Sequence, residues 1–456
     1  MSQNWSKIVA DRFSVSLPPD VEEYFDSRVW KDFTEALNRC EFSHLGGFTE
    51  QVDPERLLDP ASATVWGGQM LPDTLPILEN GGGDVIAMRF SASGVVSELI
   101  QWWHEGGIWR PFGQTLAEAI LCDVATTRFA MEDDAIHDEL SSERPAEHWA
   151  VNWVCKTTGP TLVWPDSLKG DRLCAIRSML DADLCEHVLR QESCLSFLEC
   201  GFQRSYRKMS GESLAEHLGL DWPSISDWYF DTSRIPVEYH AKLSELLNAP
   251  IDDLIRQDWD RAAEEAQRVQ SLRPDLGWPF GVMGWAADRL GDSASASTHY
   301  LDAIRAMGTS SAMSFLRLER DFLVKRINEL RQYLSPEALK DPQTVAALLP
   351  PTREFASSNL RRFWMSEARK AEEVADHRRA YNCYYRAGWD DYCTDDMDLI
   401  LDGLVRSAEG AGMTGLAHLA AHHRASLDQS CSQDVNVPTG ISLNARIRSI
   451  VKRIFG

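Results

Sequence analysis

The sequence predicts an α+β N-terminal domain, made of a helix, an antiparallel sheet and a closing helix, followed by an all-α region. Two observations predict this division. Between about residues 63 and 104, short runs of β-branched and aromatic residues alternate with turns rich in glycine and proline. From about residue 170 onward, apolar residues recur at three- and four-residue spacing, which is typical of amphipathic helices. Strands followed by helices favour an α+β domain or separate domains.

The N-terminal domain is expected over residues 1–130. Its first helix follows Pro18-Pro19, and Asp20 is the expected N-terminal cap. Three strands and a closing helix are expected, at 63–66, 84–90, 95–104 and 115–124. The run Asn80-Gly81-Gly82-Gly83-Asp84 precedes the second strand, and its glycines accept positive φ angles, which predicts a tight turn.

The rest of the chain is divided by composition. Residues 131–169 are expected to form a linker or irregular segment, because their first half is acidic and carries few large apolar side chains. A helical region is expected at 170–257 and a second set of helices at 258–428, with a break near Pro350-Pro351. Residues 429–456 are expected to form a polar linker and a tail helix.

The acidic charge is concentrated at the N-terminus. The whole chain has a net charge of −23, and residues 1–140 hold 24 acidic and 9 basic side chains. Such a segment repels phosphate backbones and favours basic partners. No apolar run approaches the roughly 18 residues required to span a bilayer. The first residues also lack the apolar core of a signal peptide, so we expect a cytoplasmic protein.

The ten cysteines contain no CxxC pair, which favours free thiols in a reducing compartment. Cys185, His187, Cys194 and Cys200 are the densest group of potential metal ligands. They lack the close pairs on tight turns that structural zinc sites use. No metal and no cofactor are expected.

Two patterns in the N-terminal domain are compatible with chemistry, and we expect neither to be catalytic. A glycine cluster can hold phosphate when a helix or a lysine follows, but here Asp84 and a strand follow. His104-Glu105, beside Trp102-Trp103, has the groups for general acid–base catalysis. Adjacent strand residues point to opposite faces, however, and no nucleophile accompanies them. The chain is therefore not expected to be an enzyme.

Short segments spread over residues 15–125 resemble the SUKH superfamily, which contains bacterial toxin-immunity proteins and a fungal cell-wall regulator. In chain order they are Leu17-Pro18, Leu71-Pro72, Leu75-Pro76, Asn80–Asp84 with the strand VIAMRF, Gly94-Val95-Val96, His104-Glu105, and Pro111-Phe112 through Leu121. The resemblance implies a non-catalytic domain that binds another protein, and toxin immunity is its most concrete form.

The candidate partner-binding residues lie at the glycine-rich turn and at the end of the strand that carries the two tryptophans. They are Asn80, Gly82, Gly83, Asp84, Trp102, Trp103, His104 and Glu105. The glycines leave backbone at the surface, and an exposed tryptophan is a common interface anchor. The expected partner is a protein, and a basic toxin domain is the most concrete candidate.

Two later segments resemble tetratricopeptide repeats, which need small residues where paired helices cross. The first, at 277–310, carries Phe280, Met283, Gly284, Ala287, Leu290-Gly291-Asp292, Ala296, Tyr300 and Ala303. The second, at 361–394, carries Trp364, Ala368, Ala371, Ala375-Asp376, Ala380, Tyr384 and Ala387. The interval 311–360 lacks these small residues. The resemblance implies helical hairpins that present a second interaction surface.

Residues 210–256 resemble a lambda-repressor-type helix-turn-helix. In that family, side chains from the helix near Pro223–Phe230 would enter the major groove. Here Asp221, Asp227 and Asp231 flank this helix, which offers no arginine or lysine. Readout of bases and phosphates needs such donors, so DNA binding is not expected. The alternative function is a transcriptional or signalling regulator that uses this segment together with the repeats as a peptide sensor.

The tail at 441–455 predicts a basic amphipathic helix. Its basic residues are Arg446, Arg448, Lys452 and Arg453. Such a helix can lie on an anionic membrane or dock on an acidic protein surface. We favour docking on protein, because the chain itself is strongly acidic.

Overall fold

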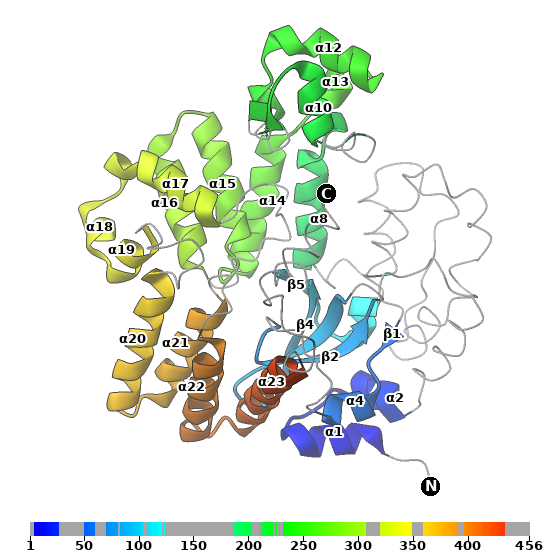
Figure 1. The fold of residues 1–456 in the computed structure, drawn as a ribbon, viewed down its shortest axis with the longest axis vertical. Coiled ribbons are helices and arrows are strands. Elements are labelled where there is room, and N and C mark those ends of the chain that lie inside the picture. The colour runs from blue at the N-terminus through cyan, green and yellow to red at the C-terminus, as the bar shows by residue number, and fades with distance from the viewer. Residues whose placement is uncertain are drawn as a thin grey trace, which may run out of the picture.

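The computed structural model describes residues 4–26, 50–59, 70–80, 83–103, 108–120, 123, 186–202, 209, 211–222, 224–225, 228, 231–306, 320–348, 359–389 and 396–433. An antiparallel sheet near the N-terminus is followed by helices, as Figure 1 shows. The predicted order of an α+β part and a helical part is confirmed. None of the helices in the described ranges combines the length and apolarity needed to cross a bilayer.

Five antiparallel strands form the sheet, and each strand pairs with the next one in the sequence. They are β1 (Glu50–Gln51), β2 (Thr74–Glu79), β3 (Val85–Phe90), β4 (Val96–Trp103) and β5 (Ile108–Gly113). The strands expected at 84–90 and 95–104 are confirmed as β3 and β4. The strand expected at 63–66 lies outside the described residues.

Strands β2 and β5 are absent from the predicted strands because each contains a proline. Pro76 lies where the pairing of β2 with β3 shifts register, and Pro111 lies on β5 at the edge of the sheet. A proline removes one ladder donor, so strands tolerate it mainly at bulges and edges. Proline content therefore concealed two strands that tertiary pairing stabilises.

Asp20 caps a different helix from the one predicted. Among the described residues, the helices before β2 are α1 (Trp5–Phe13), α2 (Pro19–Asp26) and α4 (Pro54–Leu58). Asp20 lies inside α2, and its Oδ2 accepts hydrogen bonds from the backbone N–H groups of Leu116 (2.9 Å) and Ala117 (3.3 Å). It therefore caps the helix at 116–120, which belongs to the predicted closing helix.

Four helix pairs make up most of the helical part. Their members are α8 (Glu186–Leu198) with α14 (Trp259–Leu272), α15 (Trp278–Arg289) with α16 (Ser293–Arg305), α20 (Asn359–Glu373) with α21 (His377–Trp389), and α22 (Met397–Gly410) with α23 (Thr414–Gln433). We call these eight helices the array. The pairs α15/α16 and α20/α21 coincide with the two segments that carry the repeat pattern. Helix α23 extends to Gln433, past the expected start of the polar linker at 429.

The turns inside three of these pairs share one backbone geometry. Their left-handed residues are Gly291, Ala375 and Gly412, with φ angles of 77°, 56° and 71°. In each turn an N–H group donates to the carbonyl five residues earlier: Asp292 to Ala287 (3.0 Å), Asp376 to Ala371 (2.9 Å) and Met413 to Ala408 (2.8 Å). This is the Schellman type of helix end. Three pairs are therefore built on the same turn.

Small residues lie where neighbouring helices cross, both within a pair and between pairs. A Cβ atom added to Gly284 would lie 2.6 Å from the ring of Tyr300, and one added to Gly403 would lie 2.5 Å from the ring of Tyr384. Between the second and third pairs the helices are shorter and irregular: α17 (Arg320–Glu329), η4 (Arg331–Tyr333), α18 (Pro336–Lys340) and α19 (Pro342–Leu348). This is the interval in which the repeat pattern is absent from the sequence.

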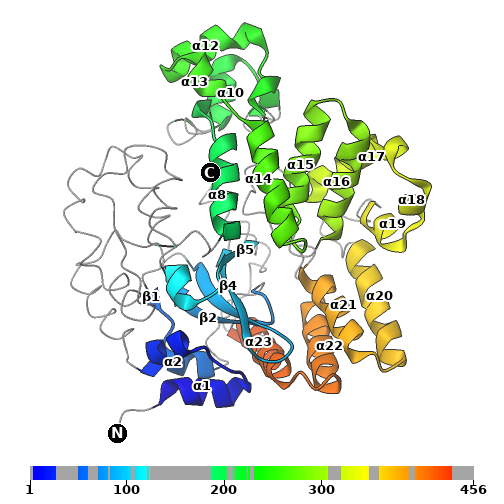
Figure 2. The same cartoon turned by 180° about the vertical axis from the view of Figure 1, so that it is seen from behind.

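A separate helical unit replaces the turn between α8 and α14. It spans residues 199–257, and we call it the inserted unit. Its described elements are α10 (Gly211–Leu218), η2 (Thr232–Arg234), α12 (Val237–Leu247) and α13 (Ile251–Ile255). The two ends of the insertion meet, because Gln257 Nε2 donates to the Leu198 carbonyl (2.7 Å) and the Asp258 N–H to the Phe197 carbonyl (2.8 Å). Figures 1 and 2 both show this unit beyond the ends of α8 and α14.

The sheet and the array share one apolar core. A single cluster of buried side chains runs from Trp5 through the sheet to Ala420 on α23. The inserted unit has its own cluster, from Cys200 to Leu254. The apolar core around the sheet therefore continues into the array, whereas the inserted unit buries its apolar side chains in a core of its own.

Candidate functional site

Part of the predicted partner-binding set gathers at one end of the sheet. Because neighbouring strands run in opposite directions, the β2–β3 turn and the end of β4 lie at the same end. Val85, next to Asp84, pairs with Trp102 across β3 and β4. We call this the turn end, and its described members are Asn80, Gly83, Asp84, Trp102 and Trp103. The predicted residues Gly82, His104 and Glu105 lie outside the described residues.

The β2–β3 turn is ordered by its own side chains. The Asp84 N–H donates to Asn80 Oδ1 (2.8 Å), and Asn80 Nδ2 donates to Asp84 Oδ2 (2.9 Å). Gly83 is exposed and has a φ of 96°, a conformation that favours glycine. The turn therefore presents a carboxylate and exposed backbone in a fixed arrangement.

The two tryptophans of β4 have different environments. Trp102 is only 3% exposed, and its indole N–H has no hydrogen-bond partner within the described part of the chain. Trp103 is half-buried, and the Arg110 guanidinium lies 5.3 Å from its ring centre. Arg110 Nε also donates to Gln101 Oε1 (2.8 Å), which fixes the arginine over the ring. Trp103 is thus the one that a partner could reach.

The opposite end of the sheet, at the β3–β4 turn, contacts other parts of the chain through the buried Gly94, while Ala92, Ser93 and Val95 of the same turn are exposed. The Ser16 N–H donates to the Gly94 carbonyl in the β3–β4 turn (2.8 Å). Ser14 Oγ lies 3.1 Å from His418 Nδ1 on α23. A Cβ atom added to Gly415 would lie 3.0 Å from the Ser14 carbonyl, so α23 approaches closely. One side of this end is therefore packed against α23 and the segment around Ser14.

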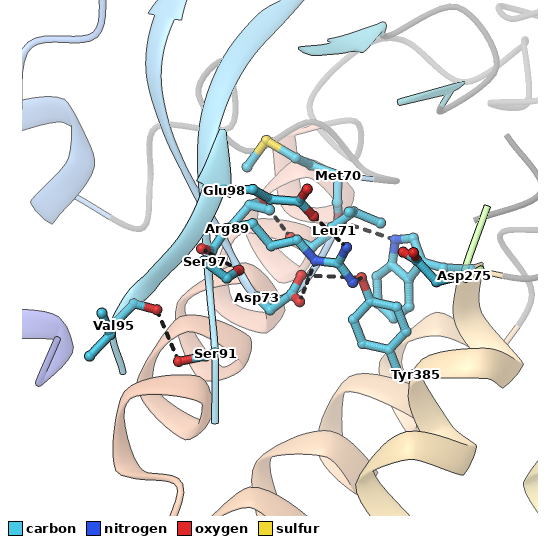
Figure 3. Close-up of polar contacts among 12 residues, drawn as sticks. Met70, Leu71, Asp73, Arg89, Ser91, Val95, Ser97, Glu98, Asp275 and Tyr385 are labelled. Carbon is cyan, nitrogen blue, oxygen red and sulfur yellow. Dashed lines mark hydrogen bonds and ion pairs between the residues drawn. The ribbon is translucent and has the colours of Figure 1, made fainter. Parts of the chain in front are cut away.

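A second cluster of polar side chains lies on β3 and β4, and sequence reasoning did not identify it. Arg89 on β3 pairs with Glu98 on β4, and Asp73 directly precedes β2. Arg89 Nε lies 3.0 Å from Asp73 Oδ2, and Arg89 Nη1 lies 3.0 Å from Glu98 Oε1. Figure 3 shows the three side chains turned toward one another, with Tyr385 reaching the same point.

The array supplies the remaining members of this cluster. The hydroxyl of Tyr385 on α21 donates to Asp73 Oδ1 and accepts from Arg89 Nη2, both at 3.2 Å. Arg273, between α14 and α15, reaches Glu98 Oε2 at 2.6 Å and Asp275 Oδ2 at 2.8 Å. We call Asp73, Arg89, Glu98, Arg273, Asp275 and Tyr385 the junction network. It joins the sheet to two separate parts of the array.

The junction network is largely dehydrated, and its arginine is held charged. The side chains of Arg89, Asp73 and Glu98 are 17%, 9% and 8% exposed. Burial alone lowers the pKa of Arg89, but Tyr385, Asp73 and Glu98 together raise it well above its ordinary value. Burial also raises the pKa of Tyr385 well above 10, so its hydroxyl keeps its proton. Arg89 and Tyr385 therefore do not change their ionisation near neutral pH.

The signal for the junction network was present in the sequence only in part. Arg89 lies within the apolar strand VIAMRF and Glu98 within VSELIQWW, and a charge inside an apolar strand indicates a buried partner. Arg273 and Tyr385 lie about 175 and 300 residues from their partners. Only the tertiary structure brings these residues together.

The helix-turn-helix pattern is altered by one buried acid. Asp231 is 2% exposed and pairs with Arg289 on α15, and it also accepts from Trp285 Nε1 at 3.1 Å. It therefore anchors the inserted unit to the array and adds no charge to the surface. Asp221 is exposed, and its Oδ1 accepts a hydrogen bond from the Ser224 N–H group. Asp227 lies outside the described residues.

The two described cysteines of the candidate zinc group, Cys194 and Cys200, lie in different apolar cores. Cys194 lies in the core shared by sheet and array, where its thiol donates to the Ala262 carbonyl, and Cys200 lies in the core of the inserted unit. Cys185 lies outside the described residues. In the ranges that the structure covers, no group of three or more histidine, cysteine, aspartate or glutamate side chains could hold a metal ion.

Comparisons of the chain with protein-family models, with curated proteins and with solved structures found no match.

Proposed function

We propose that this chain is a non-catalytic protein-interaction protein of the SUKH immunity or regulatory type. The turn end of the sheet is its partner-binding surface. The main support is the arrangement of groups at the turn end. It carries an ordered, exposed turn beside a half-buried tryptophan, whereas Gly94 in the β3–β4 turn packs on the segment around Ser14. Such a tryptophan beside exposed backbone is a common interface anchor.

The proposed partner is a basic protein domain. Residues 1–140 carry 24 acidic and 9 basic side chains, a charge that speeds encounter with a positively charged surface. In the toxin-immunity form, the turn end covers the basic, nucleic-acid-binding cleft of a toxin. Binding then inhibits by occlusion, and the chain needs no catalytic group of its own.

The array is proposed to act as a second interaction surface of the tetratricopeptide type. Support comes from the shared turn geometry of α15/α16, α20/α21 and α22/α23, and from the close packing of Gly284 on Tyr300. Repeats of this kind stack into extended surfaces that bind other proteins. The irregular helices between α16 and α20 interrupt the stack.

The test is recovery of partners from the native host with the full-length chain as bait. Asp84→Lys and Trp103→Ala should each reduce recovery of the main partner at least tenfold. The matched control is Asp11→Lys, which makes the same charge change at an exposed position of α1, near the opposite end of the sheet. Circular dichroism verifies that each bait is folded. Recovery of the same partner by both turn-end variants at the control level would refute this surface.

A regulator that uses the inserted unit is the second candidate, because this unit has its own core. Selection of sequences from a random DNA pool tests it. We expect no enriched motif at physiological salt. An enriched motif that is lost on Ser224→Glu would favour the regulator over the interaction protein.

A further inference from the structure

The sheet unit, meaning the described residues from 4 to 120, meets the array at three places. Helix α1 packs on α23, where the rings of Phe13 and His422 lie 5.2 Å apart. Strand β5 packs on α8. The junction network forms the third contact. The array therefore contacts the sheet unit through its first helix, α8, through its last helix, α23, and through the region between α14 and α21.

The polar contacts at the third place, the junction network, join specific pairs of atoms. Arg273 binds Glu98, and the Tyr385 hydroxyl bridges Asp73 and Arg89. Trp389, one turn further along α21, donates its indole N–H to the Met70 carbonyl at 3.2 Å. Each contact requires a particular atom of the sheet unit opposite a particular atom of the array. A different placement of the sheet would break several of them together.

The energetics of buried charges decide what these contacts contribute. Dehydrating an ion pair costs about as much as its attraction returns, so a buried pair adds little net stability over an apolar contact. A misplaced pair is different, because a buried carboxylate or guanidinium without its partner is strongly unfavourable. A buried network thus discriminates between arrangements more than it stabilises any one of them.

The surroundings of the network are consistent with that role. Tyr381, one turn before Tyr385, is buried, and this burial raises the pKa of its hydroxyl well above 10. Arg89 also lies 5.0 Å from the ring centre of Trp109 on β5. These aromatic walls exclude water, so a displaced charge could not be solvated in place.

We propose that the junction network holds the sheet unit in a single orientation relative to the array. We call it a keyed contact, meaning a contact whose buried charges are all paired in that orientation alone. The apolar contacts at α1/α23 and β5/α8 supply the attraction, and the network selects the position. This inference is independent of the proposed partner and of the turn end.

The test measures orientation separately from stability in the full-length chain. Genetically encoded spin labels at Glu55 on α4 and Arg378 on α21, both exposed, report the distance between sheet unit and array. The key variant, Asp73→Asn/Arg89→Met/Glu98→Gln, removes all three sheet charges and leaves Arg273 paired with Asp275. We expect a melting temperature close to that of the parent chain, together with a broadened or second distance.

A matched control neutralises a pair of similar burial inside the array. Arg190→Met with Glu265→Gln removes a contact between α8 and α14, whose side chains are 18% and 12% exposed. The label distance should not change in this control. An unchanged, single distance in the key variant would overturn the proposal, because the apolar contacts would then fix the orientation alone.

A milder variant decides the question if the key variant does not fold. Arg273→Met/Tyr385→Phe removes the array's side of the network and leaves Arg89 with both of its carboxylates. A broadened distance in this folded variant supports the keyed contact. A single distance at the parent value overturns it.

Discussion

Replacement of Arg89 by methionine should be among the most destabilising single changes in the sheet. Methionine has a similar length and suits a buried site, so the change removes charge and hydrogen bonds with little change in volume. Arg89 binds Asp73 and Glu98, each at 3.0 Å, and the Tyr385 hydroxyl at 3.2 Å. The variant leaves both carboxylates buried.

The loss in free energy of unfolding depends on which of the two carboxylates still has a positively charged partner in the variant. Glu98 retains Arg273 at 2.6 Å, so it stays compensated. Asp73 retains only the Tyr385 hydroxyl among the contacts described, so one uncompensated buried charge remains. Removing one partner of a buried pair costs about 3 to 5 kcal/mol, and we expect about 3 kcal/mol because the Tyr385 hydroxyl still donates to Asp73. Adding Asp73→Asn should recover about 2 kcal/mol, because it removes the unpaired charge.

Urea unfolding at pH 7, followed by circular dichroism, measures both free energies of unfolding. The comparison uses the parent chain, both single variants and the double variant as a cycle. A loss below about 1 kcal/mol in Arg89→Met would refute the reasoning, because the carboxylates would then be solvated in place. So would a double variant less stable than Arg89→Met.

Three further changes test other parts of the structure. Gly284→Ala places a methyl group 2.6 Å from the ring of Tyr300, so the free energy of unfolding in urea should fall by about 1 to 3 kcal/mol. Asp231→Asn removes the charge that pairs with Arg289, so amide hydrogen exchange should rise in α10 and α12 while α14 stays protected. Burial, and then Arg12, lowers the pKa of His422 to about 4, although Asp59 opposes this. Because the unfolded chain binds the proton more tightly, stability is complete above pH 6.5 and falls toward pH 4, by at most about 1.4 kcal/mol per unit.

Each of these has its own control. A Tyr300→Leu background should remove most of the Gly284→Ala penalty, and an undiminished penalty would show that the crossing is not the cause. Equal exchange in the inserted unit of Asp231→Asn and the parent chain would show that Asp231 is not its anchor. His422→Phe should lose less stability between pH 6.5 and 4, and an equal loss would assign the pH dependence to other groups.

Local patterns were enough to predict the parts of the fold whose signals are local. Strands β3 and β4 follow from runs such as VIAMRF, and the helices α15, α16, α20 and α21 follow from apolar spacing. Adjacent residues of a strand point to opposite faces, which agrees with the different exposure of Trp102 and Trp103 on β4. These features depend on residues a few positions apart.

The rest depends on contacts that no local pattern contains. Pro76 and Pro111 lowered the strand signal of β2 and β5, and pairing in the sheet overcame it. Asp20 was assigned to its own helix, but it caps a helix 96 residues away. The junction network was missed for the same reason, because Glu98 and Arg273 meet only after the array has packed on the sheet.

The insertion between α8 and α14 imposes an order on synthesis and folding. When α8 leaves the ribosome its partner does not yet exist, and at about 5 to 20 residues per second roughly 4 to 15 s pass before α14 is complete. The inserted unit can fold during this delay, because its apolar cluster lies entirely between Cys200 and Leu254. Once folded, it brings Leu198 next to Gln257, so that the nascent α14 extends directly from the end of α8. A loop that would otherwise cost entropy to close thus becomes a preformed connection that aligns the two helices.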